Sequence, residues 1–262
     1  MKIVCARALL IIACTALALS GCRKGEQTSS VQFRVVSQTP HDPAAYTQGL
    51  LLDDTVLYES TGQYGHSDVR RVDPATGQVI QTTPLPPNRF GEGLALLGGK
   101  LYQLTWQSQV AYVYDKVTLA LVDSIHYPGE GWGLATDGTN LIMSDGSDSL
   151  RIMKPDFTVL RTVHVRYRGS PLTQLNELEY IDGDVFANVY QSDWIVRLDP
   201  QTGNAKQILD FADLYLARSP GAEVMNGIAS TGKAGELFVT GKYWPVMFRV
   251  ALTSPSNQGI TR

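Results

Sequence analysis

Five similar segments recur along the chain, and their spacing limits the possible folds more than any other feature. Each starts with a polar or aromatic residue followed by a short, mainly apolar run: Gln48-Gly-Leu-Leu-Leu, Glu92-Gly-Leu-Ala-Leu, Trp132-Gly-Leu-Ala-Thr, Asn176-Glu-Leu-Glu-Tyr and Asn226-Gly-Ile-Ala-Ser. Successive starts lie 40 to 50 residues apart, with turn signals and further strand-like runs between them. Four-stranded units of this length are typical of β-propeller blades.

The fifth repeat lacks one strand, and the N-terminal region offers a replacement. After a third strand at Val246–Leu252, the chain ends in a polar tail, residues 253–262. The run Gln32–Ser37 precedes the first repeat. Pairing Phe33–Val36 into the last blade would close the ring and cover an exposed sheet edge. We therefore predict an all-β, five-bladed β-propeller over residues 32–252, closed by its N-terminal strand.

Residues 1–21 have the features of an export signal. Two basic residues precede an apolar run, Ala8–Leu19, that is too short to span a bilayer as a helix. The run leads into Leu19-Ser20-Gly21-Cys22, which resembles the bacterial lipobox. The resemblance implies that Cys22 is lipidated and that residues 22–31 tether the protein to a membrane facing the bacterial periplasm. The alternative is an ordinary signal peptide with a cysteine there by chance.

Charge and cysteine content exclude several classes of protein. The net charge is −3, with 22 Lys and Arg against 25 Asp and Glu, so nothing indicates a basic nucleic-acid-binding surface. Two of the three cysteines lie in residues 1–21, which leaves no pair for a disulfide in the mature chain. The four histidines show no metal-ligand spacing. We therefore expect no catalytic cofactor, while a structural ion on main-chain carbonyls stays open.

The repeat register places unlike side chains at one mouth of the channel. The first two strands of a blade are antiparallel, so the start of the first lies beside the end of the second. The starts are Gln48, Glu92, Trp132, Asn176 and Asn226, and the ends reach Gly62, Trp106, Gly146, Tyr190 and Lys242. Equivalent packing would favour like residues at these positions, so their diversity predicts a functional site.

Two long connections are expected at the same mouth. These are Val163–Gln174 and Asp210–Met225, and the second contains a predicted short helix at Phe211–Ala217. They are interpreted either as a rim that selects or covers what enters the channel or as variable loops.

An ordered set of motifs surrounds the mouth positions. It comprises Tyr46-Thr-Gln-Gly-Leu50, Phe90-Gly-Glu-Gly-Leu94, Leu104-Thr-Trp106, Gly131-Trp-Gly-Leu134, Leu175-Asn-Glu-Leu-Glu-Tyr-Ile181, Ala187-Asn-Val-Tyr190, Asn226-Gly-Ile-Ala229 and Val239-Thr-Gly-Lys-Tyr-Trp-Pro245. Over about residues 33–252 the sequence resembles the plant-type and bacterial glutaminyl cyclases, the glutamine cyclotransferase family of five-bladed propellers. The resemblance implies an enzyme that cyclises N-terminal glutaminyl residues of peptides or proteins to pyroglutamate and releases ammonia.

The resemblance also implies roles for individual residues. Glu92 would be the catalytic acid/base, and the substrate-binding residues would be Gln48, Asn176, Lys242, Tyr46, Trp106, Trp132 and Tyr190. Asn226 is a further channel candidate from the repeat register. The family more often has Phe at the position of Tyr46 and Trp at that of Tyr190; both departures keep a ring, so they leave fine substrate preference open rather than activity. Family members are said to carry a structural calcium ion, and none is expected to serve catalysis.

Two other functions are compatible with a propeller. One is a non-catalytic lipoprotein that binds a ligand or partner in the channel. The other is a calcium-dependent lactonase, which would need several carboxylates at the mouth, where the sequence offers only Glu92, Glu177 and Asp145. Contact with the membrane is expected only through the lipid anchor. The oligomeric state is open, with a monomer favoured.

Overall fold

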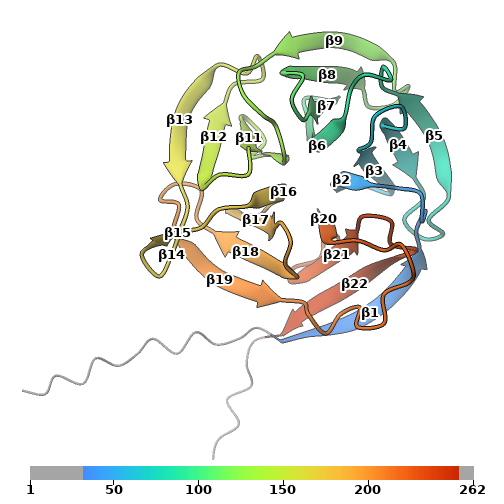
Figure 1. The fold of residues 1–262 in the computed structure, drawn as a ribbon, viewed down its shortest axis with the longest axis vertical. Helices are drawn as coiled ribbons and strands as arrows, with labels where there is room; N and C mark the ends of the chain where they lie inside the picture. The colour runs from blue at the N-terminus through green and yellow to red at the C-terminus, as the bar shows by residue number, and fades with distance from the viewer. Residues whose placement is uncertain (1–31, 254–262) are drawn as a thin grey trace, which may run out of the picture.

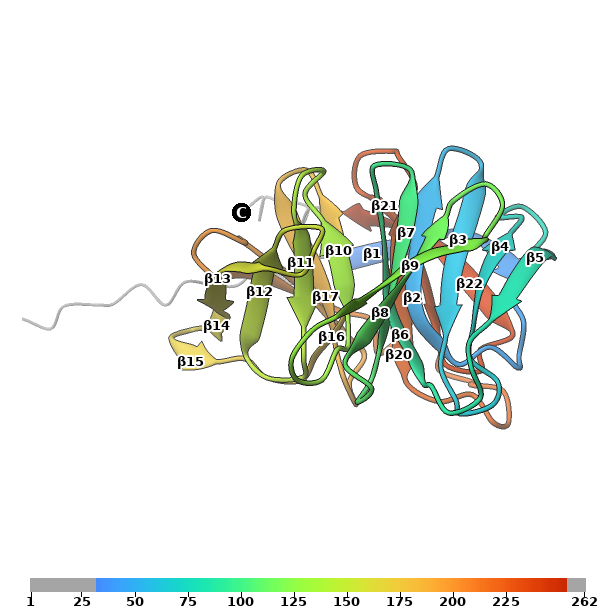
Figure 2. The same cartoon turned by 90° about the horizontal axis from the view of Figure 1, so that it is seen from above.

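Five four-stranded sheets surround a central axis in the computed structural model, which describes residues 32–253 (Figure 1). Seen from the side, the sheets form a short disc (Figure 2). The predicted export signal, Cys22 and the predicted tether lie outside the described residues, as do residues 254–262 of the predicted tail. The described part of the chain contains no helix long and apolar enough to span a bilayer.

Each sheet is one blade, and its strands follow one another outward from the axis. Blade 1 contains β2 (Thr47–Asp53), β3 (Val56–Thr61), β4 (Asp68–Val72) and β5 (Val79–Pro84). Blade 2 contains β6 (Gly91–Leu97), β7 (Lys100–Thr105), β8 (Val110–Asp115) and β9 (Leu121–His126). Blade 3 contains β10 (Leu134–Thr136), β11 (Leu141–Ser144), β12 (Ser149–Met153) and β13 (Val159–His164). Blade 4 contains β16 (Leu175–Ile181), β17 (Asp184–Val189), β18 (Trp194–Leu198) and β19 (Ala205–Asp210).

Blade 5 is assembled from both ends of the described chain. Its strands are β20 (Met225–Ser230), β21 (Glu236–Gly241), β22 (Val246–Thr253) and β1 (Gln32–Pro40). Strand β1 pairs antiparallel with β22 along its length, with one register irregularity. The predicted five-bladed architecture and its closure by the N-terminal strand are therefore confirmed. Strand β22 runs one residue into the segment predicted to be the polar tail.

The hydrophobic core is divided into five clusters, each between two neighbouring blades. The cluster between blades 1 and 5, for example, contains Leu50 and Leu57 of blade 1 and Ala229 and Met247 of blade 5. Full burial of a side chain such as leucine stabilises the fold by about 1.5–3 kcal/mol. The outermost strands contribute less, and β5 alternates between half-buried and exposed residues. This division holds the inner strands rigidly around the axis.

A glycine follows each of the first three repeat starts because a side chain there would clash with the neighbouring inner strand. Neighbouring inner strands approach closely, and a Cβ on Gly93 would lie 2.3 Å from the main-chain nitrogen of Leu134. A Cβ on Gly133 would lie 1.9 Å from the main-chain oxygen of Asn176. Only glycine permits contacts this close, so the repeated x-Gly-Leu pattern reflects the narrowness of the ring.

The predicted helix at Phe211–Ala217 is wrong, because this segment forms consecutive turns. The carboxylate of Asp210 accepts a hydrogen bond from the amide of Ala212, which starts a turn, and Leu214 N–H donates back to Phe211 O. Phe211 and Leu214 are buried in the core, so their helix-like spacing reflects tertiary packing. In the other long connection, β14 (Arg166–Tyr167) and β15 (Ser170–Pro171) form a small hairpin at the outer edge (Figure 1).

Candidate active site

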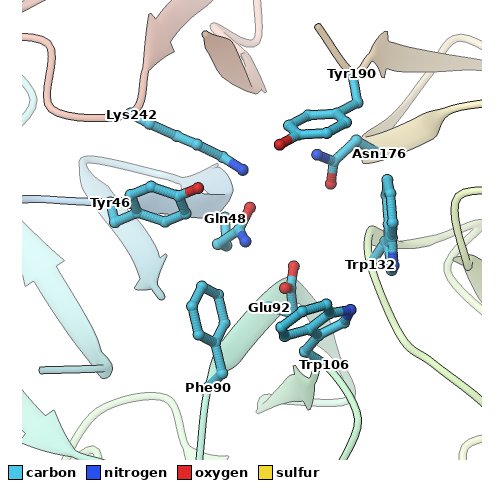
Figure 3. A pocket seen from close by; sticks show the side chains of 9 residues that line it. All are labelled: Tyr46, Gln48, Phe90, Glu92, Trp106, Trp132, Asn176, Tyr190 and Lys242. Carbon is cyan, nitrogen blue, oxygen red and sulfur yellow. The ribbon is translucent and has the colours of Figure 1, made fainter. Parts of the chain in front are cut away.

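A pocket opens at the end of the channel where the inner strands start. Nine side chains from all five blades line it: Tyr46, Gln48, Phe90, Glu92, Trp106, Trp132, Asn176, Tyr190 and Lys242 (Figure 3). The lining includes all eight residues to which the sequence analysis assigned catalysis or substrate binding. Their individual roles remain predictions. Phe90 is an addition, and Asn226 lies next to the pocket but does not line it.

Strand irregularities explain why several polar side chains reach the pocket. Four inner strands (β2, β6, β16 and β20) have a register shift near their start. The residues left without a regular cross-strand partner include Gln48, Glu92, Asn176 and Asn226. Such bulges bend a strand and redirect a side chain, and they are frequent next to active sites. The repeat therefore supplies the position, and the bulge supplies the direction of the side chain.

Glu92 and Lys242 extend toward each other from opposite sides of the pocket (Figure 3). No ion pair joins them among those formed by residues 32–253. Burial raises the pKa of Glu92 well above its ordinary value; the Lys242 ammonium opposes this rise and the Glu130 carboxylate adds to it. Burial also lowers the pKa of Lys242, despite the opposing charges of Glu92 and Glu223. Sequence alone left open whether burial or the ammonium would control Glu92, and in the structure burial prevails.

The Lys242 ammonium is held by aromatic rings. Its Nζ lies 4.5 Å from the centroid of the Tyr46 ring and 5.1 Å from that of Tyr190. Cation–π contacts of this kind are worth about 0.5–2 kcal/mol and leave the N–H groups available. Lys242 can therefore donate hydrogen bonds to a ligand in the pocket without first breaking a strong ion pair.

The amide side chains are oriented by their neighbours. Asn226 Nδ2 donates to Thr47 O at 2.9 Å and to Gln48 Oε1 at 3.1 Å. Because this contact occupies the oxygen of Gln48, its NH₂ group is left for a ligand. Asn226 thus supports Gln48 from behind the pocket wall. On the other side, Asn176 accepts a hydrogen bond at its main-chain oxygen from Ser144 Oγ, and its side-chain oxygen is buried without a hydrogen-bond partner among residues 32–253.

Aromatic rings surround these polar groups in two sets of contacts. Phe90 packs against Tyr46, with ring centroids 5.8 Å apart, and against Trp106 at 5.7 Å. Trp132 contacts Tyr190 edge to face at 5.6 Å. Phe90 could have been identified from the sequence, because it stands two residues before Glu92 just as Tyr46 stands two residues before Gln48.

The other carboxylates considered for a metal site have structural partners. Glu177 of blade 4 accepts hydrogen bonds from the amides of Leu50 in blade 1 and Ile228 in blade 5. Asp145 pairs with Arg151 at 2.5 Å. Within residues 32–253, no three His, Cys, Asp or Glu side chains gather as a metal site would require. The side chains therefore do not fit a calcium cage, and an ion held by main-chain carbonyls stays a prediction.

Comparison with known proteins agrees with this geometry. The sequence profile of the glutamine cyclotransferase family matches residues 7–252. The chain belongs to this family. A glutaminyl-peptide cyclotransferase of Arabidopsis thaliana is 44% identical over 233 residues, which cover 86% of this chain and 72% of the relative.

Solved structures place the same family on the same fold. The crystal structure of Myxococcus xanthus glutaminyl cyclase superposes with a TM-score of 0.81 at 34% identity, covering 87% of this chain and 99% of that chain. An aldose sugar dehydrogenase from Streptomyces coelicolor matches with a TM-score of 0.58 at 12% identity, covering 86% of this chain and 99% of that chain. The second likeness concerns the propeller fold alone.

Proposed function

We propose that this member of the glutamine cyclotransferase family converts N-terminal glutaminyl residues of peptides or proteins to pyroglutamate and releases ammonia. The observation that carries the proposal is the convergence of Glu92, Lys242 and two amides inside an aromatic pocket at the channel mouth. Family membership and the relatives' activities support it. A concave pocket of this kind suits a peptide terminus.

The reaction needs a positioned nucleophile and a proton shuttle. The neutral α-amine attacks its own γ-carboxamide carbon, so a C–N bond forms within the same residue. The amine nitrogen then loses a proton, the amide nitrogen gains one, and the original C–N bond breaks to release ammonia. Both proton transfers occur close together, so one carboxyl group can serve both.

Glu92 is the group that meets this requirement. Burial raises its pKa, so the proton that its carboxylate accepts from the amine is held firmly enough to be passed to the leaving nitrogen. Lys242 and the NH₂ group of Gln48 are placed to donate to the γ-carbonyl oxygen as negative charge develops there, and Asn176 contributes a further amide. Each such donor is worth on the order of 3 kcal/mol in the transition state.

The aromatic wall supplies conformational control. The glutaminyl side chain is flexible, and only its folded conformers bring the amine to the carbonyl carbon. Flat apolar rings from Phe90, Trp106 and Trp132 restrict its two methylene groups and exclude water from the amine. Because the nucleophile is already tethered, selecting this conformer accounts for much of the catalytic task.

We also propose that the protein acts as a periplasmic lipoprotein anchored through Cys22. This proposal rests on the lipobox-like sequence at residues 19–22 and on the polar tether that follows it. The substrates would then be exported peptides or proteins with an N-terminal glutamine. Metabolic labelling with a fatty acid, compared between wild type and Cys22→Ala, tests the anchor independently of the enzymatic activity.

A substrate panel tests the activity. The purified protein is incubated with a Gln-initiated dipeptide, its N-acetylated form, an Asn-initiated dipeptide and a simple lactone, and ammonia and lactone hydrolysis are followed. We expect ammonia from the first substrate only, because acetylation removes the nucleophilic amine and asparagine would close a strained four-membered ring. Lactone hydrolysis would favour the lactonase alternative. Binding of the Gln-dipeptide without turnover would favour a non-catalytic propeller.

A further inference from the structure

The carboxylate of Glu130, which does not line the pocket, accepts hydrogen bonds from two tryptophans that do. Oε2 of Glu130 accepts hydrogen bonds from the indole nitrogens of Trp106, at 2.8 Å, and Trp132, at 3.1 Å. Its other oxygen accepts one from Gln107 Nε2 at 3.0 Å. Figure 3 shows the two indole nitrogens directed to the same corner of the pocket. One oxygen atom therefore joins a residue of blade 2 to a residue of the neighbouring blade.

The connection that carries Glu130 is itself fixed. It links β9 to β10, and Arg151 Nη1 donates to Pro128 O within it at 2.9 Å. The amide of Gly131 donates to Trp106 O at 3.1 Å, which ties the segment to one of the two tryptophans. Burial tends to raise the pKa of Glu130, but hydrogen bonds from Trp132, Gln107 and Trp106 outweigh it and lower the pKa. Glu130 is therefore a stable, ionised acceptor.

Within the described part of the chain, the remaining ring contacts do not connect the two tryptophans to each other. Trp106 packs against Phe90, and Trp132 packs against Tyr190. Each of these pairs could tilt on its own, because a ring contact constrains distance more than rotation. The shared carboxylate oxygen adds the missing constraint, since both N–H groups must point at one atom.

We propose that Glu130 is a positioning residue that fixes Trp106 and Trp132 as one rigid wall against the glutaminyl side chain. This inference rests on the proposed cyclisation, in which the wall selects the conformer that closes the ring. Displacement of a positioning group by about 1 Å can lower a rate by roughly 10²-fold, so a carboxylate remote from the reacting atoms can matter for turnover.

Two conservative variants separate position from charge. Glu130→Gln keeps the length of the side chain, and its amide oxygen can accept both indole N–H groups while Gln107 turns its amide. Glu130→Asp keeps the charge but withdraws the oxygen by one methylene group. We expect Glu130→Asp to lower kcat/KM for a Gln-dipeptide about tenfold or more, and Glu130→Gln to stay within about threefold. Gln107→Ala, which leaves both indole bonds intact, is the matched control.

Two further readouts distinguish positioning from a general effect on the fold. The near-UV circular dichroism of the tryptophans should change in Glu130→Asp and remain close to wild type in Glu130→Gln, with far-UV spectra unchanged in both. In addition, Glu130→Gln should move the acid limb of kcat to lower pH, because the Glu130 charge helps to raise the pKa of Glu92. Glu130→Asp should leave that limb in place.

Opposite results would overturn the inference. Full activity and a wild-type near-UV spectrum in Glu130→Asp would show that the indoles need no shared acceptor. A larger loss in Glu130→Gln than in Glu130→Asp would show that charge, not position, is what matters. If the wild type itself releases no ammonia, the proposed function fails, while the near-UV comparison still decides the positioning claim.

Discussion

Replacement of His41 should reveal a buried ion pair beside the active site. His41 lies in the connection from β1 to β2, with its Nδ1 2.7 Å from Trp244 O and its Nε2 3.0 Å from Glu59 Oε1. Both partners accept hydrogen bonds, so both ring nitrogens must donate, and only the imidazolium can do this. Burial opposes that charge, but Glu59, together with the Trp244 carbonyl and Asp42, outweighs it, so the pKa of His41 is raised. The same contact holds the pKa of Glu59 below its ordinary value despite burial.

The size of the effect follows from the burial of both partners. His41 and Glu59 are 6% and 1% exposed, so His41→Leu leaves a buried carboxylate with the Thr47 hydroxyl, 2.7 Å away, as its hydrogen-bond donor and with the Arg70 charge acting on it. Leaving one member of a buried pair uncompensated costs about 3–5 kcal/mol. For a domain of this size, at about 2–4 °C per kcal/mol, the melting temperature should fall by about 6–20 °C. The double variant His41→Leu/Glu59→Gln should recover part of this loss, because the unpaired charge is gone.

The pKa shifts of His41 and Glu59 also predict how the stability changes with pH. Because the pKa of His41 is raised, its contribution is complete below its unfolded value of 6.5 and is lost as pH rises through the higher folded-state pKa. Because the pKa of Glu59 is lowered, its contribution is complete above 4.5 and is lost as pH falls through the lower folded-state pKa. Thermal unfolding followed by circular dichroism at pH 6 and pH 9 measures the difference in the free energy of unfolding between wild type and His41→Leu. A difference that grows between these pH values, or is under about 1 kcal/mol at pH 6, would refute the imidazolium assignment.

Two further predictions concern the pocket and the ring. Lys242→Gln should lower kcat about 10²–10³-fold, because an oxyanion donor is lost. It should also move the acid limb of the kcat–pH profile to higher pH, because the ammonium lowers the pKa of Glu92. An unshifted acid limb would contradict this. Gly133→Ala should destabilise the fold by about 1–3 kcal/mol, because the new Cβ would lie 1.9 Å from Asn176 O; an unchanged denaturation midpoint would show that the inner strands can separate.

The sequence predicts the architecture well because every blade repeats the same sequence signals. The spacing of Gln48, Glu92 and Asn176 places them at one mouth, and their positions in the structure agree. The strand register shifts that redirect these side chains leave no sequence signal, because a bulge depends on the partner strand. The direction of the Glu92 pKa shift cannot be predicted from the sequence either, because it depends on whether burial outweighs the charge of Lys242.

The roles of residues that act through their neighbours are harder to predict from the sequence. Glu130 stands two residues before Trp132, as Tyr46 and Phe90 stand before Gln48 and Glu92, but it is a carboxylate where those two are aromatic, so the repeat pattern does not predict its role. Asn226 shares a register with Gln48, but it turns to support Gln48 and does not reach the pocket lining. Phe211–Ala217 looked helical because Phe211 and Leu214 face the core, a pattern that consecutive turns reproduce.

The role of Glu92 is tested most directly by one rate comparison. Ammonia release from a Gln-dipeptide is measured for wild type and Glu92→Gln at equal concentration, with circular dichroism verifying that both are folded. The substitution keeps the size of the side chain and removes its ability to take and return a proton, so the rate should fall by about 10²–10⁴-fold. Pyroglutamate formation by Glu92→Gln within about tenfold of wild type would contradict the assignment of Glu92 as the acid/base.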